Sequence, residues 1–190
     1  MSSSKPVVTF GEIMLRLAPP GYERFLMSPS LVATFGGGEA NVAVSVANYG
    51  QAARYVTVLP PSNPIADAFI GQMRSFGIDT GYIKRQAGRF GIYFVEPGAN
   101  QRPSKVVYDR ANSSIALAKP GDLDWEGIFA NAGWFHITGI TPALSQSCAD
   151  LSIESVQVAR DMGLTVSCDL NYRKNLWKYG KSAPEVMSER

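Results

Sequence analysis

Three consecutive glycines at positions 36–38, followed by Asn41, form the stretch of this sequence best suited to holding a ligand. Glycines adopt backbone angles closed to other residues and let a ligand approach the main chain closely. A small-residue apolar run follows, so we expect a helix to begin here, and the free N–H groups of a helix start attract polar or anionic groups. Asn41, Ser45 and Asn48 would form one polar stripe on it. The stretch predicts a ligand-binding turn, although a loop that only joins a strand to a helix fits the same residues.

A second set of polar residues follows runs that are typical of buried strands. Glu12 and Gly139 each come soon after such a run, and Asp169, Asn171 and Arg173 lie at the end of another. In open parallel sheets, ligands bind beyond the carboxyl ends of the strands. We therefore expect these residues to meet at one edge. The alternatives are that Asp169 caps a turn and that Glu12 is a solvated loop carboxylate.

Strands and helices alternate along most of the chain. Four apolar or β-branched runs have the length of buried strands, at 6–10, 54–59, 134–138 and 164–170. Further helical patterns lie between or after these runs, at 64–76 with Asn63 as N-cap and Gly77 as stop, at 120–132, and at 144–162. This order predicts right-handed βαβ units, and thus an α/β fold with a mainly parallel sheet flanked by helices.

The helical period disappears between Gly81 and Asp109. Two short strand-like runs at 91–95 and 105–108 are separated by turn residues at 97–100, which is typical of a β-hairpin. The imperfectly alternating run 13–17 could join that hairpin. We therefore expect a small β-sheet lid over the glycines, built from segments of about 12–34 and 81–113 inserted into one domain that spans 1–190.

Composition restricts the kinds of partner. The chain has 190 residues, 45% hydrophobic, with a formal net charge of +2, so it can bury a sizeable core. No basic block suggests nucleic acid, and no apolar run suggests a membrane partner or a signal peptide. We expect a cytoplasmic protein whose partner is a small molecule or another protein, and a homo-oligomer formed through the exposed lid sheet.

Histidine and cysteine usage argues against a metal centre. His136 is the only histidine and lies in an apolar strand, which favours a core histidine and excludes a histidine-based zinc cluster. Cys148 and Cys168 are well separated in apolar surroundings, so we expect two buried free thiols.

Several segments together resemble the PfkB, or ribokinase, family of sugar kinases. They occur in family order over the whole chain, at 10–12, 36–43, 91–94, 107–111, 135–144 and 169–173. The glycine motif is general to the family. The segments that contain Tyr93, Tyr108 with Arg110, and Asn171 with Arg173 resemble more specifically the branch that acts on 2-keto-3-deoxygluconate.

The resemblance implies a ribokinase-like domain with a β lid that transfers the γ-phosphoryl of ATP, with Mg²⁺, to 2-keto-3-deoxygluconate. It also implies a set of sugar-binding residues, namely Gly37, Gly38, Asn41, Tyr93, Tyr108, Arg110 and Arg173. Asp169, Asn171 and Arg173 would lie on the phosphate side. These residue types suit a sugar acid, because guanidinium groups bind carboxylates in a bidentate way and tyrosines offer oriented hydroxyls.

One departure from the family pattern limits these expectations. The Gly-Ala-Gly-Asp loop that carries the family's catalytic aspartate, and its metal-associated Asn-x-x-Glu motif, occur nowhere in the sequence. We therefore assign no catalytic residue and no metal ligand to this chain and expect the base beyond Arg190. Ser182 and Glu185 form a capping box that opens a helix just before the sequence stops. We expect a chain truncated before the nucleotide-binding part, without kinase activity alone.

Other functions and structural roles fit parts of the same pattern. The chain could derive from a fructokinase or another PfkB sugar kinase, or be a non-catalytic sugar-binding module. Tyr93 and Tyr108 could simply pack across a sheet. Arg110 could form a surface ion pair with the adjacent Asp109.

Overall fold

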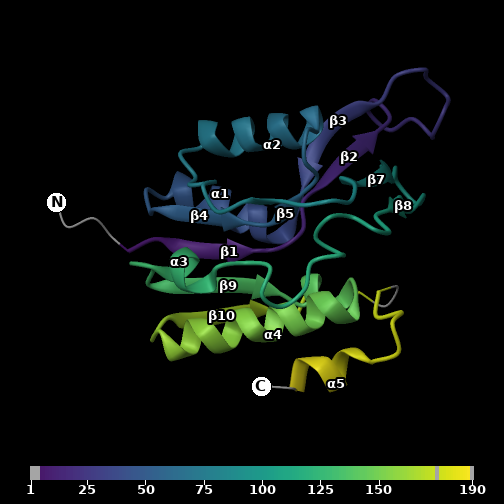
Figure 1. Cartoon of the computed structure of the whole chain (residues 1–190). Coiled ribbons are helices and arrows are strands. Elements are labelled where there is room, and N and C mark those ends of the chain that lie inside the picture. The colour runs from purple at the N-terminus through teal and green to yellow at the C-terminus, as the bar shows by residue number, and fades with distance from the viewer. Residues whose placement is uncertain (1–4, 174–175, 189–190) are drawn as a thin grey trace.

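A four-stranded parallel sheet forms the centre of the computed structural model, which describes residues 5–173 and 176–188 (Figure 1). Its strands follow the spatial order β10 (Thr165–Asp169), β9 (Trp134–Thr138), β1 (Val7–Phe10) and β4 (Ala53–Val56). Every neighbouring pair is parallel. The α/β class predicted from the alternation of strands and helices is therefore confirmed.

Helices cover both faces of this sheet because successive strand residues point to opposite sides. On one face, Val8, Phe10 and Phe135 pack in one buried cluster with α3 (Trp125–Phe129) and α4 (Gln146–Asp161). On the other face, Tyr55 packs in a second cluster with α1 (Gly38–Asn48) and α2 (Pro64–Ser75). A 3-10 turn, η1 (Thr141–Ala143), precedes α4, and α5 (Ala183–Ser188) follows the last strand.

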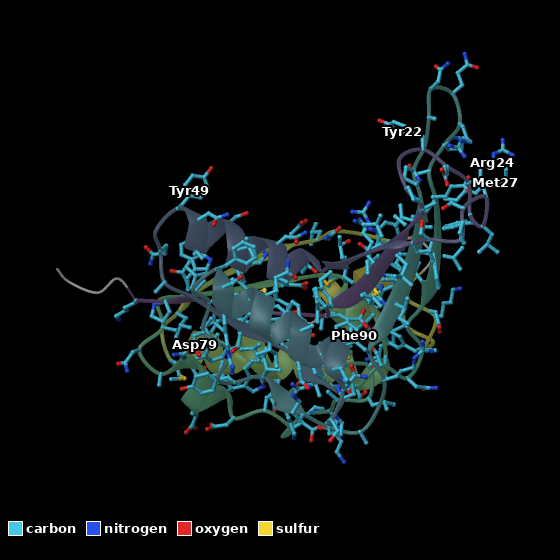
Figure 2. The ribbon with its side chains drawn as sticks, turned by 90° about the horizontal axis from the view of Figure 1, so that it is seen from above. Tyr22, Arg24, Met27, Tyr49, Asp79 and Phe90 are labelled. Atoms are coloured by element: carbon cyan, nitrogen blue, oxygen red, sulfur yellow. The ribbon has the colours of Figure 1, made fainter. Side chains whose placement is uncertain are left out.

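A second sheet projects beyond the end of the main sheet at which β1 finishes (Figure 1). Its order is β3 (Val32–Gly36), β2 (Met14–Ala18), β7 (Gly91–Glu96) and β8 (Lys105–Asp109). Hence β2 joins the β7–β8 hairpin, as the polarity of the run 13–17 suggested. Figure 2 shows Tyr22, Arg24 and Met27, from the β2–β3 loop, on the projecting part. We call this four-stranded sheet and its loops the lid.

Two strand expectations need correction. The run 54–59 is not one strand: it divides at Thr57 into β4 and β5 (Val58–Leu59), and β5 pairs with β6 (Lys84–Arg85). The N–H of Lys84 donates to the Thr57 carbonyl at 3.0 Å, so the chain leaves the main sheet there. Residues 84–85, inside the expected lid segment 81–113, thus pair outside the lid. β3 was not expected, since its strand state depends on its antiparallel pairing with β2.

The helix signals were accurate at α2 and less so at α3. The Asn63 side chain accepts from the Ala66 N–H at 3.0 Å, and Gly77 follows the helix with φ +75°. α3 has only five residues instead of the predicted 120–132. Asp124 caps it, whereas Asp122 forms an ion pair with Lys84 at 3.1 Å.

Two further expectations concern the capping of the last helix and the burial of the cysteines. The Ser182 N–H donates to the Glu185 carboxylate at 2.6 Å, as a capping box requires, while the Ser182 hydroxyl donates to the same carboxylate at 2.7 Å, a contact outside that pattern. Both cysteines are free and Cys148 is buried, but Cys168 is exposed, because β10 is an edge strand of the main sheet. Among the described residues, no helix has the length and apolarity needed to span a bilayer.

Candidate active site

A cleft of about 1440 Å³ lies between the lid and the carboxyl ends of the main strands. Its walls come from the glycine turn, from lid strands β7 and β8, from the start of α4, and from the segment that follows β10. Parallel strands are expected to bind ligands at this edge. The cleft is therefore in the place that the strand order predicted.

The residues expected to bind the sugar all line this one cleft: Gly37, Gly38, Asn41, Tyr93, Tyr108, Arg110 and Arg173. Of the group expected near phosphate, Asn171 and Arg173 line it and Asp169 does not. The Asp169 carboxylate accepts from the Asn171 N–H at 3.0 Å, so Asp169 caps the turn that follows β10. Asn171 itself has φ +39°, so Asp169 stabilises an unfavourable backbone conformation.

Gly36 and Gly37 are needed for space, and none of the three glycines is needed for an unusual backbone angle. None has positive φ, and Gly37 is extended, with φ −167°, as the N-cap of α1. A Cβ on Gly36 would collide with the Tyr93 hydroxyl, and one on Gly37 with the main-chain oxygen of Glu12. The close approach at this turn is thus made by the protein's own atoms, and this corrects the reason given from sequence.

Tyr93 and Tyr108 are direct cross-strand partners, so both of their expected roles are compatible. Their rings stack with centroids 5.9 Å apart and planes inclined by 27°. Burial raises the pKa of the Tyr93 phenol, so its hydroxyl stays protonated and can donate. The lid therefore presents a paired aromatic wall with polar tips to the cleft.

Arg110 does not pair with its neighbour in sequence. Asp109 binds Arg89 at 2.6 Å through both carboxylate oxygens, whereas the Arg110 guanidinium donates to Glu12, which is 3% exposed. The guanidinium carbon of Arg110 lies 5.5 Å from the centre of the Tyr108 ring. The structure thereby excludes both a surface pair with Asp109 and a solvated Glu12.

Arg173 is exposed on the cleft wall that follows β10. Its guanidinium donates to the main-chain oxygens of Tyr172 at 3.2 Å and of Asn171 at 3.4 Å. Lys178 lines the same cleft and was missed by the sequence reasoning. Within residues 5–173 and 176–188, no carboxylate forms an ion pair with either side chain. This wall therefore carries positive charge that the described residues do not compensate.

Glu39 also lines the cleft and was missed by the sequence reasoning. It is 1% exposed in the first turn of α1, and its carboxylate accepts from the Thr138 hydroxyl at 2.7 Å and from the Thr141 hydroxyl at 3.2 Å. Burial raises the pKa of this carboxyl. The one available signal was a lone charge in a run of small apolar residues. Glu39 fixes the glycine turn to the end of β9.

The start of α4 is a further part of the cleft wall. Ser145, Gln146 and Ser147 line the cleft, and the Ser145 hydroxyl caps the helix by accepting from the Cys148 N–H at 3.1 Å. The first turn of α1 lies at the same cleft. Two helix starts therefore line one cleft, and the positive dipole end of a helix favours an anionic ligand.

A metal site needs several ligand side chains that lie close together. In the part of the chain that the structure describes, no group of three or more His, Cys, Asp or Glu side chains could hold a metal ion. His136 is half-buried in β9, with one ring nitrogen 2.9 Å from the Ser167 hydroxyl and burial lowering its pKa, while its Nε2 is buried without a hydrogen-bond partner among the described residues.

Comparison with known proteins identifies the family. A model described as pfkB family carbohydrate kinase matches residues 4–189. The 2-dehydro-3-deoxygalactonokinase of Haloferax volcanii is 38% identical over 171 residues, which cover 90% of this chain and 53% of the relative.

Solved structures agree with this family. The 2-dehydro-3-deoxygluconokinase of Thermotoga maritima is 54% identical, with a TM-score of 0.87, and the match covers 90% of this chain and 52% of that one. The ATP-bound fructokinase of Xylella fastidiosa is 26% identical, with a TM-score of 0.82 and coverage of 97% and 57%. The chain thus spans about half the length of these proteins. On the match over 4–189 and the ribokinase-like fold, the chain belongs to the pfkB family of carbohydrate kinases.

Proposed function

We propose that this chain forms the sugar-binding part of an ATP-dependent kinase whose acceptor is a 2-keto-3-deoxy sugar acid, with 2-keto-3-deoxygluconate as the first candidate. The observation that carries the proposal is the convergence of seven expected sugar-binding residues, from the glycine turn, the lid and the segment after β10, on one cleft. The names of the two most similar relatives described above support the sugar-acid class.

The charge of the cleft supports an acidic sugar. An incoming carboxylate meets Arg173 and Lys178 on one wall and two helix starts beside them. Arg110, in contrast, shares its charge with Glu12. Guanidinium groups bind carboxylates through charge-assisted hydrogen bonds, which are roughly twice as strong as neutral ones. A neutral ketose would leave the exposed cations without a partner.

The lid residues would orient the sugar and keep water from the acceptor. Tyr93 and Tyr108 lie where their hydroxyls can contact the sugar's hydroxyl groups. Exclusion of water matters in such a reaction, because water competes with the sugar hydroxyl for the phosphoryl group. Phosphoryl transfer also needs a base and charge stabilisation, for which this sequence offers no Gly-Ala-Gly-Asp loop. We therefore infer that the 190-residue chain binds the sugar without phosphorylating it.

Calorimetric titration of the chain with 2-keto-3-deoxygluconate, its galactonate epimer and fructose tests the proposal. Arg173→Ala and Arg110→Ala should each weaken binding of the sugar acid about tenfold or more, since a hydrogen bond to a charged group contributes about 1.5–3 kcal/mol. Binding of fructose should change less than about twofold. Equal losses for acid and neutral sugar would favour the fructokinase alternative.

A coupled assay for ADP release tests the second part of the proposal. The wild-type chain with ATP, Mg²⁺ and sugar acid should give no ADP above the rate without sugar. Sugar-dependent ADP release would show that the chain holds a complete active site and would overturn this part. ATP titrated alone distinguishes a purely sugar-binding module, which needs only the sugar, from half of a kinase site.

The remaining expectations belong to the same proposal. We propose a cytoplasmic location, a lid formed by inserted segments of about 12–34 and 81–113 apart from residues 84–85, which pair with β5, and self-association through the lid. Strand β8 supports the last point, because all five of its residues are exposed and it is an edge of the lid sheet. Unpaired sheet edges tend to find partners.

A further inference from the structure

Glu12 lies at the junction between the main sheet and the lid. The chain crosses this junction four times: from β1 to β2 through Glu12 itself, from β3 to α1 at Gly37, into β7 at Gly91, and out of β8 at Arg110 to Ser113. A residue that contacts every crossing, through its side chain or its main chain, could set the position of the lid. Glu12 is the residue that does so.

The contacts of Glu12 are made with each of the other crossings. Its carboxylate accepts from the Ser113 hydroxyl at 2.8 Å and from the Arg110 guanidinium. A Cβ on Gly91 would lie 3.1 Å from one Glu12 carboxylate oxygen, which is tighter than an ordinary contact, so the glycine lets the Glu12 side chain lie close to the start of β7. The main-chain oxygen of Glu12 packs against Gly37.

We propose that Glu12 is a positioning residue that fixes the lid against the main sheet and orients Arg110 in the sugar cleft; the second role rests on the proposed function. Both partners are buried, with the Arg110 side chain 12% exposed. Loss of one member leaves the other as an uncompensated buried charge. Arg110 also has a buried Nε without a hydrogen-bond partner among the described residues, so Glu12 does not satisfy every donor of the guanidinium group.

Glu96 provides a matched control. It is also 3% exposed, pairs with Arg102 at 3.0 Å, and accepts from the Phe25 N–H at 3.0 Å. All of these partners lie within the lid, none is at the junction with the main sheet, and Glu96 does not line the cleft. Glu96→Ala therefore removes the same kind of carboxylate–arginine contact without touching a crossing.

Hydrogen exchange of the ligand-free chain tests the first role. Glu12→Ala should speed exchange of amides in β7 and β8 about tenfold relative to those in β1 and β9, because exchange reports local opening. Glu96→Ala should speed exchange mainly around 23–27 and 97–102. Equal acceleration in both sheets by Glu12→Ala, or none, would overturn the role. If Glu12→Ala does not fold, Ser113→Ala should show the same pattern of exchange in weaker form. If Ser113→Ala does not show this pattern, the role of Glu12 in fixing the lid is equally contradicted.

A double-mutant cycle on 2-keto-3-deoxygluconate binding tests the second role. Glu12→Ala should raise the Kd about tenfold in the wild-type background and less than about twofold in Arg110→Ala, because Glu12 acts through Arg110. Glu96→Ala should leave the Kd unchanged. Equal losses in both backgrounds would overturn the orienting role. If the wild-type chain binds no sugar acid, the proposed function fails, and so does the role of Glu12 in orienting Arg110. The exchange experiment still decides whether Glu12 fixes the lid against the main sheet.

Discussion

Replacing each of two adjacent glycines by alanine should have opposite effects on stability. A Cβ on Gly37 would lie 3.2 Å from the Ile13 side chain and closer than 3.0 Å to the Glu12 carbonyl oxygen, an approach that real Cβ atoms essentially never show. A Cβ on Gly38 would meet Thr138 at 3.6 Å and Asn171 at 3.7 Å, which are ordinary contacts. Neither residue has positive φ, so the two substitutions differ in packing and not in backbone strain.

The expected magnitudes follow from these contacts. At Gly37, the glycine turn or the Glu12 main chain has to move by several tenths of an ångström, and overpacking of this kind costs about 1–3 kcal/mol. Gly38 is the first residue of α1, where alanine is a better helix former than glycine and restricts the unfolded chain, so Gly38→Ala should be neutral or stabilise by up to about 1 kcal/mol.

Thermal unfolding followed by circular dichroism measures the difference. At about 2–4 °C for each kcal/mol in a chain of this size, Gly37→Ala should lower Tm by about 2–12 °C, and Gly38→Ala should leave it unchanged or raise it by up to about 4 °C. Urea midpoints with unchanged slope would confirm that stability has changed and not the unfolding mechanism. An equal loss of stability in both variants would refute the steric argument for Gly37.

Three further predictions concern other parts of the molecule. Burial raises the pKa of the Glu39 carboxyl above 4.5, so the contribution of this group to stability is complete below pH 4.5 and is lost as pH rises through the raised pKa. The Tm of Glu39→Gln minus the Tm of the wild type should therefore increase as pH rises. A difference that stays constant with pH would contradict this. Val107 is 54% exposed on β8, so light scattering should show a dimer that Val107→Lys dissociates; a monomeric wild type would contradict this. A thiol reagent should modify Cys168 only, because Cys148 is buried with its pKa raised to about 12; two fast thiols would contradict this.

The lid illustrates how far local patterns carry a prediction. The turn residues after β7 and the loss of helical period were enough to predict a hairpin, and its antiparallel pairing is confirmed. They could not show that Lys84–Arg85 pairs with β5, because that pairing depends on where the chain leaves the main sheet, at Thr57, 27 residues before Lys84. Strand pairing between distant segments is decided by packing, which local pattern does not contain.

The candidate site shows the same division. Its sugar-binding residues were selected by resemblance and not by periodicity, and the structure adds that they line one cleft. Lys178, Ser145 and Glu39 were missed, because a lysine in a loop or a serine before a helix carries no local sign of the space it faces. Such residues are recognised only when distant elements are placed together.

By itself, the sequence determined the α/β class, the capped helix α2 and the kinds of side chain available for an acidic sugar, because these depend on neighbours within a few positions. Only the tertiary structure decided that Arg110 pairs with Glu12, 98 positions away, and not with the adjacent Asp109. It also decided that Gly37 is crowded by Glu12 and Gly38 is not. These contacts arise where the lid crossings meet the main sheet, so they exist only in the folded chain.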